Sequence, residues 1–198
     1  ALIDLDPQGS STRWLANRPA SLASIIGTEG FQNSLQVTKT WHLRTPENSD
    51  LAVIDTPAGL TRQELISATR GADAILIPVM PSDIDFHAVM KCISALLLVA
   101  KIPRPDLKIG IIANRVRANT RVYGQLKKFL SSLDIPVVAT LRDSQNYTRA
   151  FEFGMGIHEM PFSQVKKDID AWSDIMGWLD RLRERNLGQP SAIHYLRG

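Results

Sequence analysis

The chain has 198 residues, of which 44% are hydrophobic and 22% are charged. This composition is ordinary for a globular protein, and the length is enough to bury a core in one domain without disulfides or metals. The single cysteine, Cys92, excludes a disulfide framework, fits a reducing compartment and is interpreted as a small packed residue. The longest apolar run, residues 95–100, is too short to span a bilayer. We therefore expect a cytoplasmic protein without a membrane span.

The formal net charge of +3 is spread unevenly along the chain. Residues 101–149 contain ten Lys and Arg residues but only three acidic ones. Such a block indicates either a polyanionic partner, such as nucleic acid, or a basic face that is merely solvated. The sequence alone leaves both interpretations open.

Hydrophobic patterns predict strands that alternate with helices along the whole chain. Five apolar runs are expected to be strands, at residues 1–5, 51–56, 74–79, 108–113 and 136–140. Helices are expected at residues 10–18, 61–69, 81–101, 122–133, 146–153 and 165–186. This order predicts an α/β protein with a mostly parallel, doubly wound sheet and helices on both of its faces.

Three local patterns predict where individual helices begin or end. Ser10 or Ser11 is the expected N-cap of the first helix. Thr61 and Glu64 have the spacing of a capping box at the start of the second helix. Gly154 is expected to end the helix before it in a left-handed cap.

Two stretches are less informative. Residues 20–50 contain many turn residues and are expected to form one or two short helices with loops around Trp41, which is interpreted as a core anchor. No linker divides the chain, so one domain is predicted over residues 1–186. Residues 187–198 are predicted to be a polar, disordered C-terminal tail.

Two of the predicted strands end in aspartates that open similar turns. Residues 1–10 read ALIDLDPQGS, and about fifty residues later residues 51–59 read LAVIDTPAG. In open α/β sheets, a buried strand that stops at a carboxylate places an acid at the binding edge. Asp4, Asp6 and Asp55 are therefore predicted to converge on a single polyanion or metal site.

These motifs resemble the signatures of the ParA/MinD family of deviant Walker ATPases. DLDPQGS is similar to the signature called Walker A′, and VIDTPAG is similar to Walker B. The resemblance continues through IPVMPSDIDF, IIANR and LRDSQNYTRAFEFG, so it covers nearly the whole chain. It implies a P-loop NTPase-like fold and an ATP hydrolase that uses ATP and Mg²⁺.

The resemblance also implies roles for individual residues. Asp6 would orient the attacking water, Asp4 would lie beside the metal shell, and Asp55 would hold Mg²⁺ through water. Further nucleotide contacts are implied for Thr56 and Gly59 near the γ-phosphate, and for Asn114 and Arg115 near the adenine. The alternative for the acids is a turn cap, because Asp-Pro is a common turn opener. Asn114 alternatively satisfies a turn.

The basic block contains the segment that resembles the family's DNA-contacting part. Arg142 and Arg149 lie in this segment, and Lys127 and Lys128 lie on a neighbouring predicted helix. Lys and Arg contacts with phosphates bind DNA without sequence preference. Arg142 is alternatively a packing or nucleotide-loop residue.

The resemblance further implies a set of partners and a location. An ATP-dependent homodimer would bind non-specific DNA, and a ParB-like or adaptor protein would stimulate hydrolysis. The protein would be associated with the bacterial nucleoid, and its cargo would be a plasmid, a chromosome origin or a protein assembly.

One signature of the family has no counterpart in the sequence. No glycine is followed by lysine, so the phosphate-binding pattern G-x-x-x-x-G-K-[ST] has no match. The chain also starts inside a predicted strand without a Met. We expect a fragment that lacks the first strand, the phosphate-binding loop and the first helix, and that is inactive on its own.

Two alternatives to the ATPase remain. One is a non-catalytic ParA-like binding module that has lost its phosphate-binding loop. The more remote one is a haloacid-dehalogenase-like phosphatase, whose D-x-D motif holds a nucleophile and an acid. Pro7 and Gln8 stand where that family has Gly-Thr, and the sequence has no later Gly-Asp-x-x-x-Asp pair.

Overall fold

The computed structural model describes residues 1–30, 46, 49–102, 108–185 and 191–196. Its strands are β1 (Leu2–Asp4), β2 (Gly27–Glu29), β3 (Leu51–Thr56), β4 (Ala74–Val79), β5 (Ile109–Val116), β6 (Val137–Arg142) and β7 (Ser191–Leu196). Its helices are α1 (Ser10–Ala16), α2 (Arg62–Thr69), α3 (Asp83–Leu98), α4 (Arg121–Ser131), α5 (Gln145–Glu152), the 3-10 helix η2 (Ile157–Glu159) and α6 (Phe162–Arg185).

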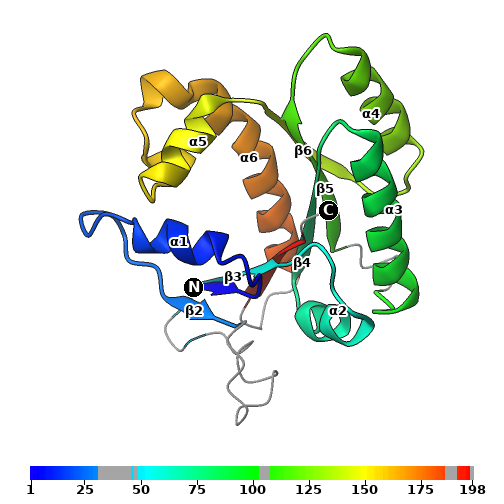
Figure 1. Ribbon diagram of the computed structural model, residues 1–198, viewed down its shortest axis with the longest axis horizontal. Helices are drawn as coiled ribbons and strands as arrows, with labels where there is room; N and C mark the ends of the chain where they lie inside the picture. Colours follow the sequence, from blue (N-terminus) through cyan, green and yellow to red (C-terminus); the bar gives the residue numbers. More distant parts are fainter. Residues whose placement is uncertain (31–45, 47–48, 103–107, 186–190, 197–198) are drawn as a thin grey trace.

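The strands form one sheet in the order β2-β1-β3-β7-β4-β5-β6, and the neighbouring strands are parallel (Figure 1). Helices α2, α3 and α4 lie on one side of the sheet, and α1 and α6 lie on the other (Figure 1). The predicted α/β class with a doubly wound parallel sheet is confirmed.

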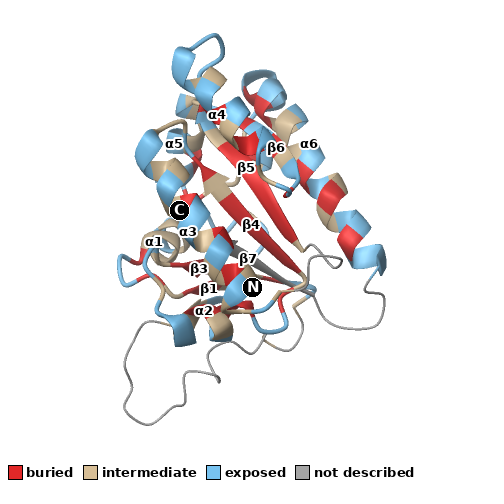
Figure 2. Cartoon of the chain, turned by 90° about the vertical axis from the view of Figure 1, so that its right-hand side faces the viewer, coloured by how far each residue is buried: buried red, intermediate tan, exposed pale blue. Residues whose placement is uncertain are grey.

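The core consists of two apolar layers, one on each face of the sheet. Alternate residues of a strand point to opposite faces. In β4, Ile75 and Ile77 therefore join the layer under α2, α3 and α4, whereas Leu76 joins the layer under α6 with Ile175 and Trp178. Figure 2 shows these buried residues concentrated along the central strands and on the inner sides of the helices. Nearly continuous apolar strands are what a sheet covered on both faces requires.

Two of the three predicted helix boundaries are confirmed. The Thr61 hydroxyl accepts a hydrogen bond from the Glu64 amide, and the Glu64 carboxylate accepts one from the Thr61 amide, which completes the capping box. Gly154 follows α5 with a φ of 62°. The third prediction is wrong, because the N-cap of α1 is Gly9 and not Ser10 or Ser11.

The edge of the sheet next to β1 differs from the prediction for residues 20–50. Gly27–Glu29 form the short strand β2 instead of a helix. The Leu2 amide donates to the Ile26 carbonyl and the Gly30 amide to the Asp4 carbonyl, so β2 continues the sheet beyond β1. Trp41 lies outside the described residues.

The C-terminal segment also differs from the prediction. Ser191–Leu196 form β7, which pairs in parallel with both β3 and β4 in the middle of the sheet. The predicted disordered tail is therefore wrong for these six residues. The segment reads SAIHYL, and its β-branched Ile193 and aromatic Tyr195 favour a strand. The rest of residues 187–198 lies outside the described part.

Within the described part of the chain, no helix is both long and apolar enough to cross a bilayer.

Candidate functional site

The three aspartates of the two motifs lie together at the carboxyl ends of β1 and β3. Asp4 and Asp55 are register partners on these neighbouring strands, and Asp6 follows Asp4 by two residues. All three are buried, with relative exposures of 2% for Asp4, 8% for Asp6 and 5% for Asp55. Buried carboxylates require hydrogen-bond or ionic partners. The three acids therefore lie at one edge of the sheet, and each carboxylate has its own hydrogen-bond partners.

Both carboxylate oxygens of Asp4 accept hydrogen bonds. Oδ1 accepts one from the Asp6 amide at 3.0 Å. Oδ2 accepts one from the Thr12 amide at 2.8 Å and one from the Thr12 hydroxyl at 3.0 Å. Because Gly9 has no side chain to cap α1, Asp4 satisfies an amide in its first turn instead. Asp4 thus caps helix α1, whereas the only structural role that the sequence analysis considered for it was a turn cap.

Asp6 closes the turn that leads into α1. Its Oδ1 accepts from the Gln8 amide at 2.9 Å, and its carbonyl accepts from the Gly9 amide at 2.8 Å. Gly9 has a φ of 61°, a left-handed conformation that glycine adopts at no steric cost. Asp6 therefore makes the turn contact that was the alternative to a catalytic role.

Asp55 is bound by a side chain of α1. The Ser11 hydroxyl donates to Asp55 Oδ2 at 2.6 Å. The next residue, Thr56, is fully buried, whereas Gly59 is exposed and has nothing within 4 Å of the position that a Cβ would occupy. The strand thus passes from a buried acid to an open turn within a few residues, as a ligand-binding edge requires.

This acid group fits Mg²⁺ only as a partly hydrated ion. Among the described residues, no three His, Cys, Asp or Glu side chains form a metal-binding group. Mg²⁺ in nucleotide sites is usually held by one or two carboxylates together with waters and substrate phosphates. Asp55 with the Ser11 hydroxyl supplies such a limited oxygen set. For the phosphates themselves, the sequence offers no Gly-Lys pair.

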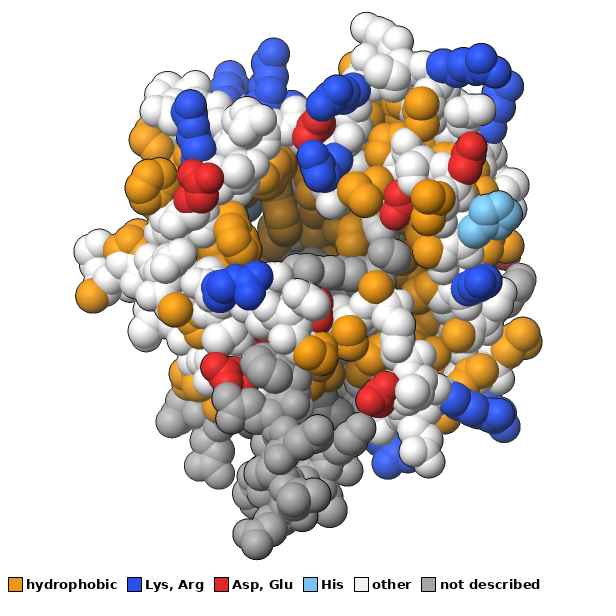
Figure 3. All heavy atoms as spheres, viewed as in Figure 1, with side chains coloured by type: hydrophobic (Ala, Val, Ile, Leu, Met, Phe, Trp, Pro, Cys, Tyr) orange, Lys and Arg blue, Asp and Glu red, His pale blue; other side chains and the backbone are white. Residues whose placement is uncertain are grey.

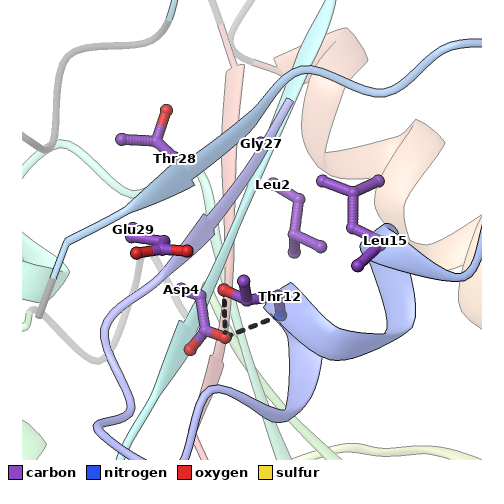
Figure 4. Close-up of a pocket in the computed structure, with 8 residues that line it drawn as sticks. Leu2, Asp4, Thr12, Leu15, Gly27, Thr28 and Glu29 are labelled. Carbon is purple, nitrogen blue, oxygen red and sulfur yellow. Dashed lines mark hydrogen bonds between the residues drawn. The ribbon is translucent and has the colours of Figure 1, made fainter.

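A small pocket lies beside Asp4, between α1 and the edge strand β2 (Figure 4). It has a volume of about 270 Å³, and its lining includes Asp4, Thr12, Leu15 and Glu29. Neither Asp6 nor Asp55 lines it. Its volume lies just below the roughly 300–1,000 Å³ of typical ligand pockets, and it shares Asp4 with the acid group.

Asn114 and Arg115 lie on β5, far along the same sheet edge. Three strand spacings separate β5 from β3, and Asn114 lies four residues beyond Gly110, the residue level with Asp55 across the sheet, so Asn114 is roughly 20 Å from Asp55. Both residues fall in a register irregularity between β5 and β6, and Asn114 Oδ1 accepts from the Arg115 amide. The predicted strand ended at residue 113, but β5 continues to Val116. Only an extended ligand could reach both Asn114 and the acid group.

Two arginines of this region share one acid. Arg115 Nε lies 3.4 Å from Asp143 Oδ1, and Arg117 binds Asp143 Oδ2 at 2.7 Å. The hydrogen bond from Arg117 is the main reason that the pKa of Asp143 lies below its ordinary value. The backbone of Arg115 has a φ of 50°, which is uncommon for a side chain other than glycine. The sequence analysis did not single out Asp143 for this role.

Arg142 is bound by a buried acid. Its guanidinium donates to both oxygens of Asp168, at 2.7 and 2.8 Å, and the Asp168 side chain is fully buried. Asn146 Nδ2 donates to the same carboxylate at 2.8 Å. The hydrogen bond to Asp168 raises the pKa of Arg142 above its ordinary value. This geometry matches the packing alternative for Arg142.

The other three candidate DNA contacts are exposed, and the Arg142 side chain also keeps 45% exposure despite its ion pair. Arg149 lies on α5, and Lys127 and Lys128 lie on α4, where Lys127 Nζ also sits 5.0 Å from the centre of the Tyr123 ring. Figure 3 shows Lys and Arg side chains gathered along the upper part of one face, over α5 and α4, with a hollow lined by hydrophobic side chains below them. The basic block therefore lies at least partly on the surface.

Ser11 and Thr12 are the site residues that the sequence analysis missed. Both belong to the SST segment directly after the DLDPQG motif, where Ser11 was considered only as a helix N-cap and Thr12 was not considered. Their hydroxyls bind the two acids at the strand ends. The only sequence feature that could have indicated this role is the position of these hydroxyl residues directly after the motif.

The comparisons with known proteins agree with this architecture. No protein-family model matches the sequence. A protein named "Maintenance of carboxysome distribution protein A" from Halothiobacillus neapolitanus is 26% identical over 162 residues, which make up 80% of this chain and 73% of that protein. A protein of the same name from Gloeobacter kilaueensis is 28% identical over 97 residues, or 49% of this chain and 43% of that protein.

Among solved structures, the chain is similar to the MinD cell division protein of Aquifex aeolicus. The TM-score is 0.51 with 19% sequence identity, and the match covers 66% of this chain and 55% of that one. This similarity shows that the fold is of the ParA/MinD type. Together with the two relatives, it supports the resemblance seen in the sequence motifs.

Proposed function

We propose that this chain belongs to a ParA-like ATPase that positions a cargo within the cell. The observation that carries the proposal is the meeting of Asp4, Asp6 and Asp55 at the carboxyl ends of two adjacent parallel strands, in a fold of the ParA/MinD type. In open α/β sheets this edge is where ligands bind.

The three acids have separate tasks in this proposal. Asp55 holds Mg²⁺ through water, with the Ser11 hydroxyl fixing the orientation of its carboxylate. Asp6 orients the water that attacks the γ-phosphate. Asp4 keeps α1 in place through Thr12. Bound Mg²⁺ would neutralise charge that develops on the phosphates.

The remaining nucleotide contacts are Thr56 and Gly59 near the γ-phosphate, and Asn114 and Arg115 near the base. The exposed turn at Gly59 and the position of Asn114 on the same sheet edge are compatible with an extended nucleotide. The phosphates also need a cradle of backbone amides and a lysine. Residues 1–198 contain no Gly-Lys pair, so the proposal requires that these groups come from outside residues 1–198, and "full-length protein" below means the protein that includes them.

The cargo and partners follow from the relatives and from the basic surface. Two similar proteins are named for carboxysome distribution, so a large protein assembly is the cargo that we favour over a plasmid or chromosome. Arg149, Lys127 and Lys128 would bind DNA phosphates in an ATP-dependent homodimer. An adaptor on the cargo would stimulate hydrolysis and release the dimer.

The two alternatives fare differently. A haloacid-dehalogenase-like phosphatase needs a free carboxylate as its nucleophile, whereas both oxygens of Asp4 are occupied by Asp6 and Thr12. A non-catalytic binding module is compatible with the missing lysine pattern. It differs from the ATPase in one measurable property, nucleotide binding.

The proposal is tested by titrating full-length protein with Mg·ATP in a calorimeter and measuring phosphate release with and without DNA. Saturable ATP binding and slow hydrolysis are expected. The protein should also bind unrelated DNA sequences alike, with an affinity that falls steeply with salt. DNA binding without any nucleotide binding would instead identify the non-catalytic module.

A further inference from the structure

The C-terminal end of α1 is bound to the segment that joins α5 to α6. The Arg18 side chain, only 8% exposed, donates to both Glu159 oxygens, at 2.9 and 2.5 Å. It also donates to the carbonyl of Gly154 at 3.1 Å and to that of Ala23 at 2.9 Å. Four hydrogen bonds thus hold one buried guanidinium between segments that are far apart in the sequence.

The two backbones approach each other closely at the same place. A Cβ on Gly154 would lie 2.4 Å from the backbone nitrogen of Arg18, so no side chain fits there. The Trp14 indole nitrogen donates to the Met155 carbonyl at 3.1 Å. The Gly156 amide donates to Glu159 at 2.6 Å, which orients the carboxylate toward Arg18. The contact is therefore fixed by packing as well as by charge.

The N-terminal end of α1 is bound to the acid group. Ser11 donates to Asp55, and Thr12 donates to Asp4. The helix has seven residues, which makes it about 10 Å long. The acid group and the Arg18 contacts therefore lie at opposite ends of one short helix.

We propose that α1 links the acid group to α5, with Arg18 and Glu159 as the positioning residues that hold its far end. This inference rests on the proposed function, because it assumes that a ligand changes the contacts of Asp55. Any such change alters the hydrogen bond to Ser11 and is carried along α1 to residues 154–159. Helix α5, which bears the exposed Arg149, ends directly before Gly154.

One short helix thus contacts the Asp4–Asp55 pair at its start and, just beyond its last residue, the Arg18–Glu159 pair. In this arrangement, the occupancy of the acid group changes the position of α5. Reciprocally, a ligand bound at α5 changes the affinity at the acid group, because coupling between two sites acts in both directions.

The test uses full-length protein and three variants. Glu159→Gln removes the charge but keeps an acceptor for the Gly156 amide. Arg18→Lys keeps the charge but loses the two-pronged geometry. Asp180→Asn, at an exposed position of α6, is the matched control for a carboxylate-to-amide change. For each protein, calorimetry gives the ATP affinity, and DNA affinity is measured with and without Mg·ATP.

A spectroscopic readout follows α1 directly. The indole N–H signal of Trp14, identified with a Trp14→Phe variant, reports the contact with Met155, and that of the core residue Trp178 serves as reference. In the parent, Mg·ATP is expected to shift the Trp14 signal more than the Trp178 signal. In Glu159→Gln this response should be lost while ATP affinity stays within about twofold of the parent.

The ratio of DNA affinities with and without ATP should fall by roughly 2- to 30-fold in Glu159→Gln, the range that coupling mutations produce. Arg18→Lys should retain part of the parental ratio, and Asp180→Asn all of it. If Glu159→Gln does not fold, the ratio of DNA affinities in Arg18→Lys tests the inference instead. The inference is overturned if ATP binds but Trp14 does not respond, or if the folded variants keep the parental ratio. A parent that does not bind Mg·ATP overturns the proposed function and the inference with it.

Discussion

Asp4 and Asp55 stand opposite each other in register on β1 and β3, and each accepts a hydrogen bond from a different residue of α1. Thr12 donates to Asp4 and Ser11 to Asp55. The first turn of one helix thus bridges two strand ends. Through this bridge, the acids both stabilise the helix and are oriented by it.

Asp4→Ala should mainly reduce stability. The substitution leaves the Thr12 and Asp6 amides without the acceptor that they share in a buried region. Losing a helix cap costs about 1 kcal/mol, and an unsatisfied buried donor costs a further 1–3 kcal/mol. Urea unfolding should therefore show a loss of about 2 kcal/mol or more. A variant as stable as the parent that has lost ATP hydrolysis would instead assign Asp4 a catalytic role.

Arg142→Ala and Arg149→Ala should behave differently although both remove one positive charge from the same region. Without Arg142 the buried carboxylate of Asp168 loses its counter-ion, which should cost about 1–3 kcal/mol, because the arginine side chain is 45% exposed and solvent screens part of the interaction. Arg149 is exposed, and its loss should change stability by less than about 0.5 kcal/mol.

DNA binding then separates the two roles of these arginines. Arg149→Ala should weaken binding equally on unrelated sequences and reduce its salt dependence. The measurements are urea unfolding and a DNA titration at several salt concentrations. An Arg142→Ala variant with parental stability and weaker DNA binding would show that Arg142 binds DNA and is not needed for packing.

Stability should fall in acid because of Asp168. Burial by itself would raise the pKa of this carboxyl, but hydrogen bonds from Arg142 and Asn146 hold it below its ordinary value of 3.8. As the pH falls below about 4, the unfolded state takes up the proton before the folded state does, so the stabilisation present at neutral pH is lost. Urea midpoints between pH 7 and 3 should fall less steeply for Asp168→Asn than for the parent. Parallel curves would show that the Asp168 pKa is not lowered by folding.

Cys92 should be nearly inert toward thiol reagents. Burial raises its pKa to about 11, so at pH 8 only about one thiol in a thousand is the reactive thiolate. Alkylation of native protein should be on the order of 10²-fold slower than that of a free cysteine, and it should become fast in denaturant. Rapid labelling of the native protein would contradict the packed interpretation of this residue.

The sequence was most informative where local and tertiary preferences agree. The strand at residues 51–56 and the strand at residues 74–79 have the predicted bounds, because a continuous apolar run between turn residues fits a sheet covered on both faces. The capping box of Thr61 and Glu64 was predictable because it depends on four consecutive residues.

The predictions were wrong or incomplete where a hydrogen-bond partner comes from a segment that is distant in the sequence. Gly9 needs no capping side chain of its own because Asp4 reaches α1 from β1. Segment 191–196 becomes a strand because β3 and β4 offer backbone partners on both sides. The Arg142–Asp168 pair joins β6 to α6, and such a contact cannot be predicted from a local sequence pattern.

The proximity of Asp4 and Asp55 was predictable from the two aspartate motifs. The register of two parallel strands brings Asp4 and Asp55 together, and the two motifs indicated where both strands end. The hydroxyls that bind the acids could not be predicted, because their direction depends on how α1 packs against β1.

The central claim is that Asp6 and Asp55 have different tasks in ATP hydrolysis, and one comparison in the full-length protein tests it most directly. ATP affinity, dimer mass and turnover are measured side by side for Asp6→Ala and Asp55→Ala. Asp6→Ala should bind Mg·ATP and dimerise while turnover falls by roughly 10²-fold or more, as when a general base is removed. Asp55→Ala should lose Mg²⁺-dependent nucleotide binding and form no dimer. If Asp6→Ala hydrolyses ATP at the parental rate, Asp6 only closes the turn at Gln8 and the claim is contradicted.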